Sequence, residues 1–236
     1  MKRFSNEIMK IKAVRQLPGA GLCFFVIAFI VCSASPSFAQ TIIKSFPDKV
    51  ASRFSDYEII GKNDAGLIVH FFGTNESELV TYDDNLKISN RKELPFKGKA
   101  ATLESIILQQ NRILAFYTTN GVDYQYLKLK ILDSKLTIPN ETILLDSIPL
   151  ASIGKGKAFY IKTSPDKSKI MAFNMLKTKS AYFVRFILLS DSIRVLNRNI
   201  LNVQSTAGMS LKSVKINNEG NVMAVVGQEN GSDDYN

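Results

Sequence analysis

The sequence predicts an all-β protein built from a repeated unit of about four antiparallel strands. Three observations support this prediction: apolar segments of strand length recur along the chain, turn-forming residues separate them, and similar segments return at intervals. The 236 residues are 45% hydrophobic, which is too many for a disordered chain. The 7 Pro and 13 Gly exclude a collagen-like or low-complexity chain.

The first 39 residues have the pattern of a secretory signal peptide. A basic leader, Met1–Ala20, precedes an unbroken apolar run, Leu22–Val31, and the small residues Ser37–Ala39 stand before Gln40. We therefore expect cleavage near Ala39-Gln40 and an exported protein, periplasmic or extracellular, that touches the membrane only through the signal sequence. An uncleaved anchor is the alternative, and the short apolar run disfavours it because a membrane span needs about 20 residues.

Both cysteines, Cys23 and Cys32, fall inside this predicted signal peptide. The mature chain would contain none, which excludes a disulfide framework and thiol chemistry. Val31 stands before Cys32 where a lipoprotein signal has a small residue, so we do not expect lipid attachment.

The formal net charge of +9 could indicate a nucleic-acid or membrane partner. Residues 1–39 hold five basic side chains and one acidic one, so nearly half of this charge belongs to the predicted signal peptide. The remaining charge is spread over predicted turns, in the pairs Lys97/Lys99, Lys155/Lys157, Lys167/Lys169 and Lys177/Lys179. We therefore expect a solvated surface and no nucleic-acid partner.

Four segments of the remaining chain align with one another. They are Gly66–Phe72, Asn111–Tyr117, Ser168–Asn174 and Gly220–Val226. One aligned column holds Ile68, Ile113, Ile170 and Val222, at spacings of 45, 57 and 52 residues. Two positions later the column holds His70 in the first repeat and Ala115, Ala172 and Ala224 in the others. Each segment is apolar on both alternating faces, as is typical of a strand that is covered on both sides.

A strand and a polar turn precede each aligned segment, and a third strand, a second turn and a short fourth strand follow it. Four-stranded units at this period predict the blades of a β-propeller. We expect blades at about 57–99, 100–153 and 157–203, an incomplete blade at 211–236, and an N-terminal segment, 40–56, that could supply a ring-closing strand. Because about three and a half blades would leave sheet edges open, we expect a chain that continues further or a sheet supplied by another chain.

The turn Ser164-Pro165-Asp166-Lys167-Ser168-Lys169-Ile170 resembles the Ser-Pro-Asp-Gly-x-x-Ile turn of bacterial secreted β-propeller repeat proteins with TolB-like or WD-repeat-like blades. Lys167 stands where those blades have Gly. The resemblance covers roughly residues 55–236. It implies a propeller fold and is weak evidence for any particular function.

The sequence offers few candidates for chemistry. His70 is the single histidine and lies inside an apolar strand, so we expect a buried structural residue rather than a zinc ligand or part of a catalytic triad. Asp83-Asp84 and Asp233-Asp234 are expected to form turns, and Gly154–Lys157 a flexible link. A pair of catalytic carboxylates from different blades stays open. We assign no catalytic, cofactor-binding or metal residue and expect no cofactor.

The interpretation that follows is an exported β-propeller binding or interaction module, with a protein or a glycan as its ligand. Whether this segment is an enzyme stays open, although a non-enzyme is favoured because no catalytic motif is recognisable. Two alternatives place the functional domain after Asn236. In one the chain is the N-terminal propeller of a larger exported enzyme, such as a peptidase resembling the prolyl oligopeptidase type or another hydrolase. In the other it is the propeller of a membrane sensor.

Overall fold

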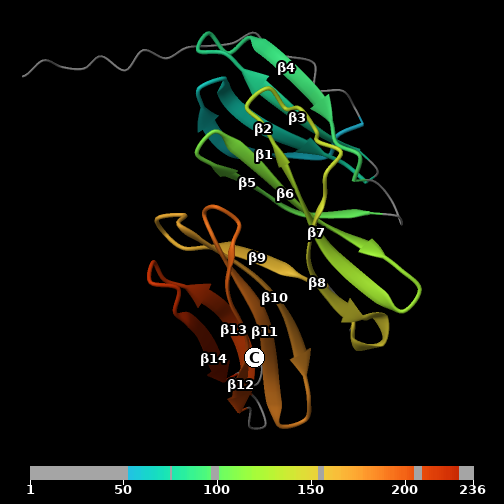
Figure 1. Ribbon diagram of the computed structural model, residues 1–236, viewed down its shortest axis with the longest axis vertical. Helices are drawn as coiled ribbons and strands as arrows, with labels where there is room; N and C mark the ends of the chain where they lie inside the picture. Colours follow the sequence, from blue (N-terminus) through green and yellow to red (C-terminus); the bar gives the residue numbers. More distant parts are fainter. Residues whose placement is uncertain (1–52, 75, 97–100, 154–156, 205–208, 229–236) are drawn as a thin grey trace, which may run out of the picture. The chain divides into compact units, whose positions relative to one another are not determined.

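The computed structural model describes residues 53–74, 76–96, 101–153, 157–204 and 209–228, all within one compact unit, Ile43–Asn236. This part of the chain contains fourteen strands, one short 3-10 helix and no α-helix (Figure 1). The predicted all-β fold is therefore confirmed. The predicted signal peptide, both cysteines, residues 40–52, the Lys97/Lys99 pair, residues 154–156 of the predicted flexible link and Asp233-Asp234 lie outside the described residues.

The strands form three four-stranded antiparallel sheets and a two-stranded one, each in chain order. The first sheet contains β1 (Asp56–Asn63), β2 (Gly66–Phe72), β3 (Ser77–Tyr82) and β4 (Ile88–Glu93). The second contains β5 (Thr102–Gln109), β6 (Arg112–Asn120), β7 (Tyr124–Leu132) and β8 (Ile143–Pro149), and the helix η1 (Leu150–Ser152) follows it. The third contains β9 (Tyr160–Thr163), β10 (Lys169–Lys177), β11 (Ala181–Ser190) and β12 (Val195–Gln204). The fourth contains β13 (Met209–Ile216) and β14 (Val222–Gln228).

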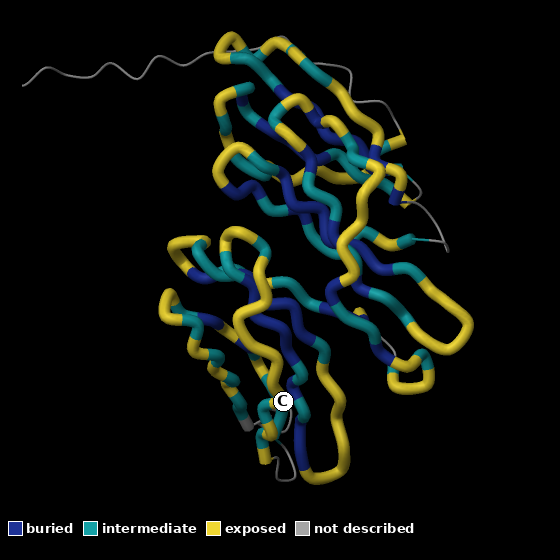
Figure 2. The backbone as a smooth tube through the Cα atoms, in the orientation of Figure 1, coloured by how far each residue is buried: buried dark blue, intermediate teal, exposed yellow. Residues whose placement is uncertain are grey.

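Successive sheets pack face to face, with their first strands next to one another. β1 contacts β5, β5 contacts β9, and β9 contacts β13. A separate apolar cluster lies in each of the three gaps between consecutive sheets. Figure 2 shows the buried backbone in the middle strands of the sheets and the exposed backbone at many of the turns. Meandering four-stranded sheets that are stacked in chain order with adjacent first strands are β-propeller blades.

The turns after the third strands share one design. The Oδ1 atom of Asp83 accepts hydrogen bonds from the backbone N–H groups of Asn85 and Lys87 at 2.9 and 2.8 Å. The Oδ1 atom of Asp133 likewise accepts hydrogen bonds from the backbone N–H groups of Lys135 and Thr137. The hydrogen bond from Thr137 is the main cause of the lowered pKa of the Asp133 carboxyl. The expected role of Asp83 as a turn former is thus visible in its hydrogen bonds.

A leucine or isoleucine occupies the left-handed position of each of these turns: Leu86 has φ of 57°, Leu136 59° and Ile193 63°. This conformation costs an L-residue roughly 1–2 kcal/mol. Leu136 is only 1% exposed and belongs to the apolar cluster between the first and second sheets. Burial of its side chain offsets the backbone strain, because a fully buried leucine contributes about 1.5–3 kcal/mol.

The Ser164 turn joins three of the sheets. Ser164 donates its hydroxyl to Asp166 Oδ1 at 2.6 Å, which is the main cause that lowers the pKa of the Asp166 carboxyl. Lys167 has φ of 59°, so it takes the left-handed position at which the blades it resembles have Gly. Its carbonyl accepts a hydrogen bond from Gln109 of β5 at 3.1 Å, and the Asp166 N–H donates to Asn218 before β14 at 3.2 Å.

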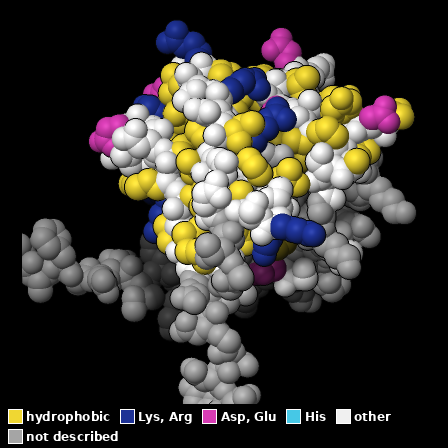
Figure 3. Space-filling view, turned by 90° about the horizontal axis from the view of Figure 1, so that it is seen from below, with side chains coloured by type: hydrophobic (Ala, Val, Ile, Leu, Met, Phe, Trp, Pro, Cys, Tyr) yellow, Lys and Arg dark blue, Asp and Glu magenta, His cyan; other side chains and the backbone are white. Residues whose placement is uncertain are grey.

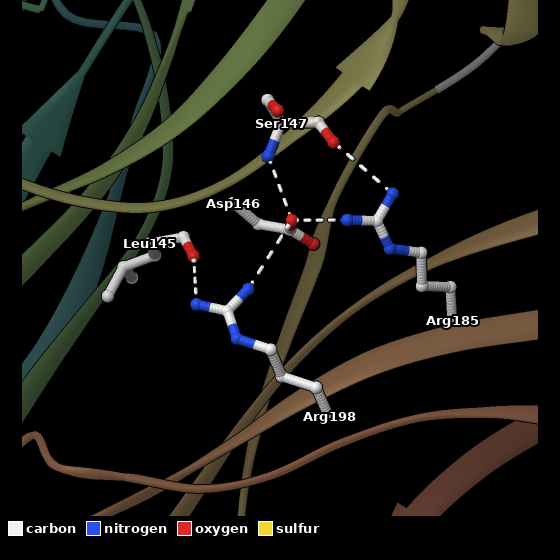
Figure 4. A network of polar contacts seen from close by, with 5 residues as sticks. All are labelled: Leu145, Asp146, Ser147, Arg185 and Arg198. Carbon is white, nitrogen blue, oxygen red and sulfur yellow. Dashed lines mark hydrogen bonds and ion pairs between the residues drawn. The ribbon is translucent and has the colours of Figure 1, made fainter.

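A charged network, the Asp146 cluster, crosses the gap between the second and third sheets (Figure 4). Asp146 of β8 accepts a hydrogen bond from Arg185 of β11 at 2.5 Å and lies 3.7 Å from an Nη atom of Arg198 of β12. Arg185 also donates to the Ser147 carbonyl at 3.3 Å, and Arg198 to the Leu145 carbonyl at 3.0 Å. Both arginines therefore clamp the last strand of one blade to the face of the next.

The structure corrects the alignment of the first repeat by one residue. β1 and β2 pair beside their turn through Asn63 and Gly66, and β5 and β6 pair there through Gln109 and Arg112. Gly66 therefore corresponds to Arg112, and not to Asn111 as the sequence alignment had it.

As a result, His70 corresponds to Phe116 and not to Ala115. Phe116 faces the third sheet and Phe173 faces the fourth, so both point to the following sheet, as His70 points to the second. The alignment failed because β2 is apolar on both faces, and such a strand does not fix its own register.

Candidate functional site

A cavity of about 530 Å³ lies between the first and second sheets. Its walls come from both sheets, with His70, Phe72 and Ser77 on one side and Thr102–Ile106 of β5 on the other. We call it the His70 cavity. Its volume falls in the range of roughly 300–1,000 Å³ that is typical of small-ligand sites.

His70 is the central polar side chain of this cavity. It is 6% exposed, its Nε2 atom lies 2.8 Å from the Ser77 hydroxyl oxygen, and its ring centroid lies 5.1 Å from that of Phe72. Burial lowers the pKa of His70 from 6.5 to about 4. At neutral pH the imidazole is therefore uncharged, with one nitrogen that donates and one that accepts. The expectation of a buried histidine holds, but the side chain faces a cavity rather than a filled core.

The His70–Ser77 pair has the spacing of a base and a nucleophile. A working triad also needs a third group that orients the other ring nitrogen. Among the residues that the structure describes, no carboxylate bonds to the His70 ring. The pair is therefore equipped to hydrogen-bond a ligand.

Three glutamates line the same cavity in different environments. Glu58 lies directly opposite His70 in the β1–β2 pairing, so both side chains project from the same face. Glu76 is paired with Arg53 at 3.1 Å. Glu104 sits at the bulge of β5, where it accepts a hydrogen bond from the Thr118 hydroxyl at 2.9 Å and lies 3.3 Å from Lys157 Nζ.

Glu58 is thus the carboxylate most available to a ligand. It is exposed, and within the described ranges it has no ion-pair partner. Glu104 is turned towards Thr118 and Lys157, which line a separate cavity of about 330 Å³ between the second and third sheets. The His70 cavity therefore presents a neutral imidazole, a hydroxyl and one unpaired carboxylate beside the ring of Phe72.

Among the residues of this cavity, His70 stood out in the sequence, whereas Glu58, Ser77 and Glu104 did not. A signal for Glu58 existed in the sequence, because Glu58 and His70 form a cross-strand pair of two polar residues. The equivalent pairs each contain a phenylalanine: Ser105 with Phe116 in the second sheet and Tyr160 with Phe173 in the third. That signal becomes visible only after the one-residue shift of the first repeat.

Asp84, part of the predicted Asp83-Asp84 turn, lies on the surface. Asp84 is exposed and pairs with Lys62 at 2.6 Å, and the hydrogen bond from Lys62 is the main cause that lowers the pKa of the Asp84 carboxyl. In the view of Figure 3, Lys and Arg side chains are scattered among hydrophobic ones. Across the described ranges, no group of three or more potential metal-binding side chains comes together. In the same ranges there is no helix with the length and hydropathy needed to span a membrane.

The sequence matches no family model and no curated protein. Among solved structures it is similar to an endo-arabinase from Bacteroides thetaiotaomicron, with a TM-score of 0.43 and 14% identity over 80% of this chain and 76% of that one.

Two further similarities are lower. Prolyl oligopeptidase B from Galerina marginata gives a TM-score of 0.38 and 11% identity, over 72% of this chain and 23% of that one. The Nup133 β-propeller domain from Vanderwaltozyma polyspora gives a TM-score of 0.36 and 10% identity, over 78% of this chain and 56% of that one. At these scores the propeller assignment rests on the sheets and apolar clusters of the chain itself.

Proposed function

We propose that this chain is an exported β-propeller binding module whose ligand occupies the His70 cavity. The observation that carries the proposal is the exchange of Phe for His at one blade position. Phe116 is fully buried in the apolar cluster between the second and third sheets. Phe173 is 4% exposed and packs in the cluster between the third and fourth sheets, where it also borders a cavity of about 560 Å³. Burying a polar imidazole there requires its ring nitrogens to lose water, and burial penalises its protonated form, as the low pKa indicates. The imidazole borders a cavity that a ligand can enter. A position that served folding alone would favour the apolar residue of the other blades.

The lining points to a neutral, polyhydroxylated ligand, and we propose a sugar unit of a glycan. His70 and Ser77 provide both donor and acceptor atoms, and Glu58 provides acceptor oxygens for ligand hydroxyls. Phe72 offers an apolar surface on which the C–H face of a sugar ring can pack. This proposal is one of the two ligand classes that the sequence left open.

Export forms part of the same proposal. The basic leader, apolar run and small-residue cleavage pattern in residues 1–39 support secretion to the periplasm or beyond, with a mature chain from Gln40. The Ser164–Ile170 turn supports a place among TolB-like or WD-repeat-like secreted propellers. N-terminal sequencing of the protein recovered outside the cytoplasm would test the cleavage site; a chain that retains Met1 there would contradict it.

The ligand proposal can be tested by isothermal titration calorimetry of the full-length protein against a panel of neutral mono- and oligosaccharides. We expect at least one saturable binder. His70→Phe, which introduces the residue of the other blades, should abolish that binding because it removes the hydrogen-bonding ring nitrogens from the cavity. Asp84→Asn serves as the control, since Asp84 lies on the surface and pairs with Lys62. A panel without binders, or unchanged affinity in His70→Phe, would overturn the proposal.

A further inference from the structure

The Asp146 cluster carries an excess of positive charge that no described carboxylate balances. Arg185 and Arg198 both approach Asp146, and neither has a second ion-pair partner among the residues that the structure describes. One carboxylate therefore faces two guanidinium groups, because arginine stays protonated in proteins.

The two guanidinium groups are fixed in position and remain partly open to solvent. The Asp146 side chain is 8% exposed, while those of Arg185 and Arg198 are 42% and 52% exposed. Each arginine is held by a backbone carbonyl as well as by Asp146, as Figure 4 shows. Of the five N–H donors of each guanidinium, several remain available for an added acceptor. Such preorganised forks lose little entropy when they bind an oxyanion.

A cavity of about 190 Å³ lies beside this cluster. Its lining includes Asp146, Arg185 and Arg198. Ile187 of β11 packs in the cluster between the second and third sheets. Arg198 pairs with Ile187, and Arg185 is two residues before it on the same strand, so both arginines lie on the face that meets the second sheet. Two guanidinium groups and a cavity therefore lie together between β8, β11 and β12.

A second arginine–carboxylate cluster in the same chain provides an internal comparison. In this Glu78 cluster, Arg53 and Arg91 lie 3.9 and 3.7 Å from the buried carboxylate of Glu78. Arg53 is also paired with Glu76 at 3.1 Å. Two guanidinium groups there meet two carboxylates, so the Glu78 cluster is balanced and has no need of an anion.

We propose that the Asp146 cluster binds a tetrahedral oxyanion, a sulfate or phosphate group, through Arg185 and Arg198. The same chemistry is found in the free inorganic ion and in a sulfate or phosphate ester on a sugar. This site is separate from the His70 cavity and does not depend on the function proposed for it.

The test is calorimetric titration of the full-length protein in a buffer free of sulfate and phosphate. The probes are inorganic sulfate, inorganic phosphate, glucose 6-sulfate, glucose 6-phosphate and, as the neutral control, glucose. We expect saturable binding of the anions and none of glucose. Tighter binding of the esters than of the inorganic ions would identify the ester as the source, and the reverse order would identify the free ion.

Matched variants separate this role from a purely structural one. Arg198→Gln keeps the Arg185–Asp146 pair and removes the excess charge, so it should weaken anion binding at least about tenfold. Arg91→Gln removes an arginine from the Glu78 cluster and should leave binding unchanged. Asp146→Asn should tighten binding, because it removes the competing carboxylate; circular dichroism confirms that each variant folds. Equal affinities in Arg198→Gln, Arg91→Gln and the parent protein would overturn the proposal, as would the absence of anion binding.

Discussion

The first and second gaps between the sheets are built on the same strand pattern and are filled differently. In the second gap Phe116 is fully buried among the aliphatic side chains of two sheets. In the first gap His70 takes the equivalent position and borders a cavity of about 530 Å³. The difference teaches that a blade position can serve either the core or a site. The exchange of one aromatic residue for an imidazole accompanies the change.

The largest expected effect comes from emptying the second gap. Phe116→Ala should lower the free energy of unfolding by about 3–5 kcal/mol, because it removes a fully buried ring and leaves a void. His70→Ala should cost much less, since the first gap already holds a cavity. Urea denaturation of both variants measures the difference, and equal losses would break the comparison between the two gaps.

The next effect is a pH dependence that belongs to the first gap alone. The pKa of His70 is about 4 in the folded protein and 6.5 in the unfolded chain. Between these values the unfolded chain binds more protons, so stability rises with pH there. The contribution of His70 to the free energy of unfolding is complete above pH 6.5 and is lost as the pH falls towards 4. The total loss is about 3 kcal/mol at 1.36 kcal/mol per pKa unit.

Urea denaturation at a series of pH values checks this prediction. His70→Phe should remove the slope between pH 6.5 and 4 and leave stability at neutral pH within about 1 kcal/mol of the parent. Phe116→Tyr, which adds no group that titrates in this window, should keep the slope. A parent protein whose stability is flat over this range would contradict the assignment.

A smaller effect concerns the charged clamp across the second gap. Asp146→Ala should destabilise the fold by about 1–3 kcal/mol, because the Ser147 N–H and two arginines lose a buried acceptor. Asp84→Ala is the control and should leave the unfolding midpoint nearly unchanged, because its pair with Lys62 is exposed to solvent. Thermal unfolding of both variants gives the comparison, and similar midpoints would show that the clamp adds nothing.

The smallest effect concerns the turn that ties the second gap at its edge. Lys167→Asn should stabilise the protein by about 0.5–1 kcal/mol, because Asn tolerates the left-handed backbone at this position better than Lys. The Gln109 hydrogen bond to the residue 167 carbonyl involves only backbone on that side and should persist. Lys169→Asn, two residues later inside β10, should give no such gain; a destabilised Lys167→Asn would contradict the prediction.

Local information in the sequence was enough for the blade architecture. Turn residues such as Asp83, Asp133 and Ser164 bond to backbone groups a few positions away, so their role depends on the neighbouring sequence alone. The apolar segments and their spacing likewise reflect strands that are covered on both faces. The sequence also showed that Lys167 stands where the blades it resembles have Gly, and the structure adds that this residue takes the left-handed conformation.

Only the tertiary structure decided which face of the first repeat meets which sheet. A strand that is apolar on both faces can be shifted by one residue without a visible change in its pattern, and this shift moved His70 from an alanine column to a phenylalanine position. The sites follow the same logic, since Glu58 and His70 are paired by strand register, and Asp146 meets Arg185 and Arg198 only across two sheets. Contacts between residues distant in sequence are set by packing, and packing is a property of the whole fold.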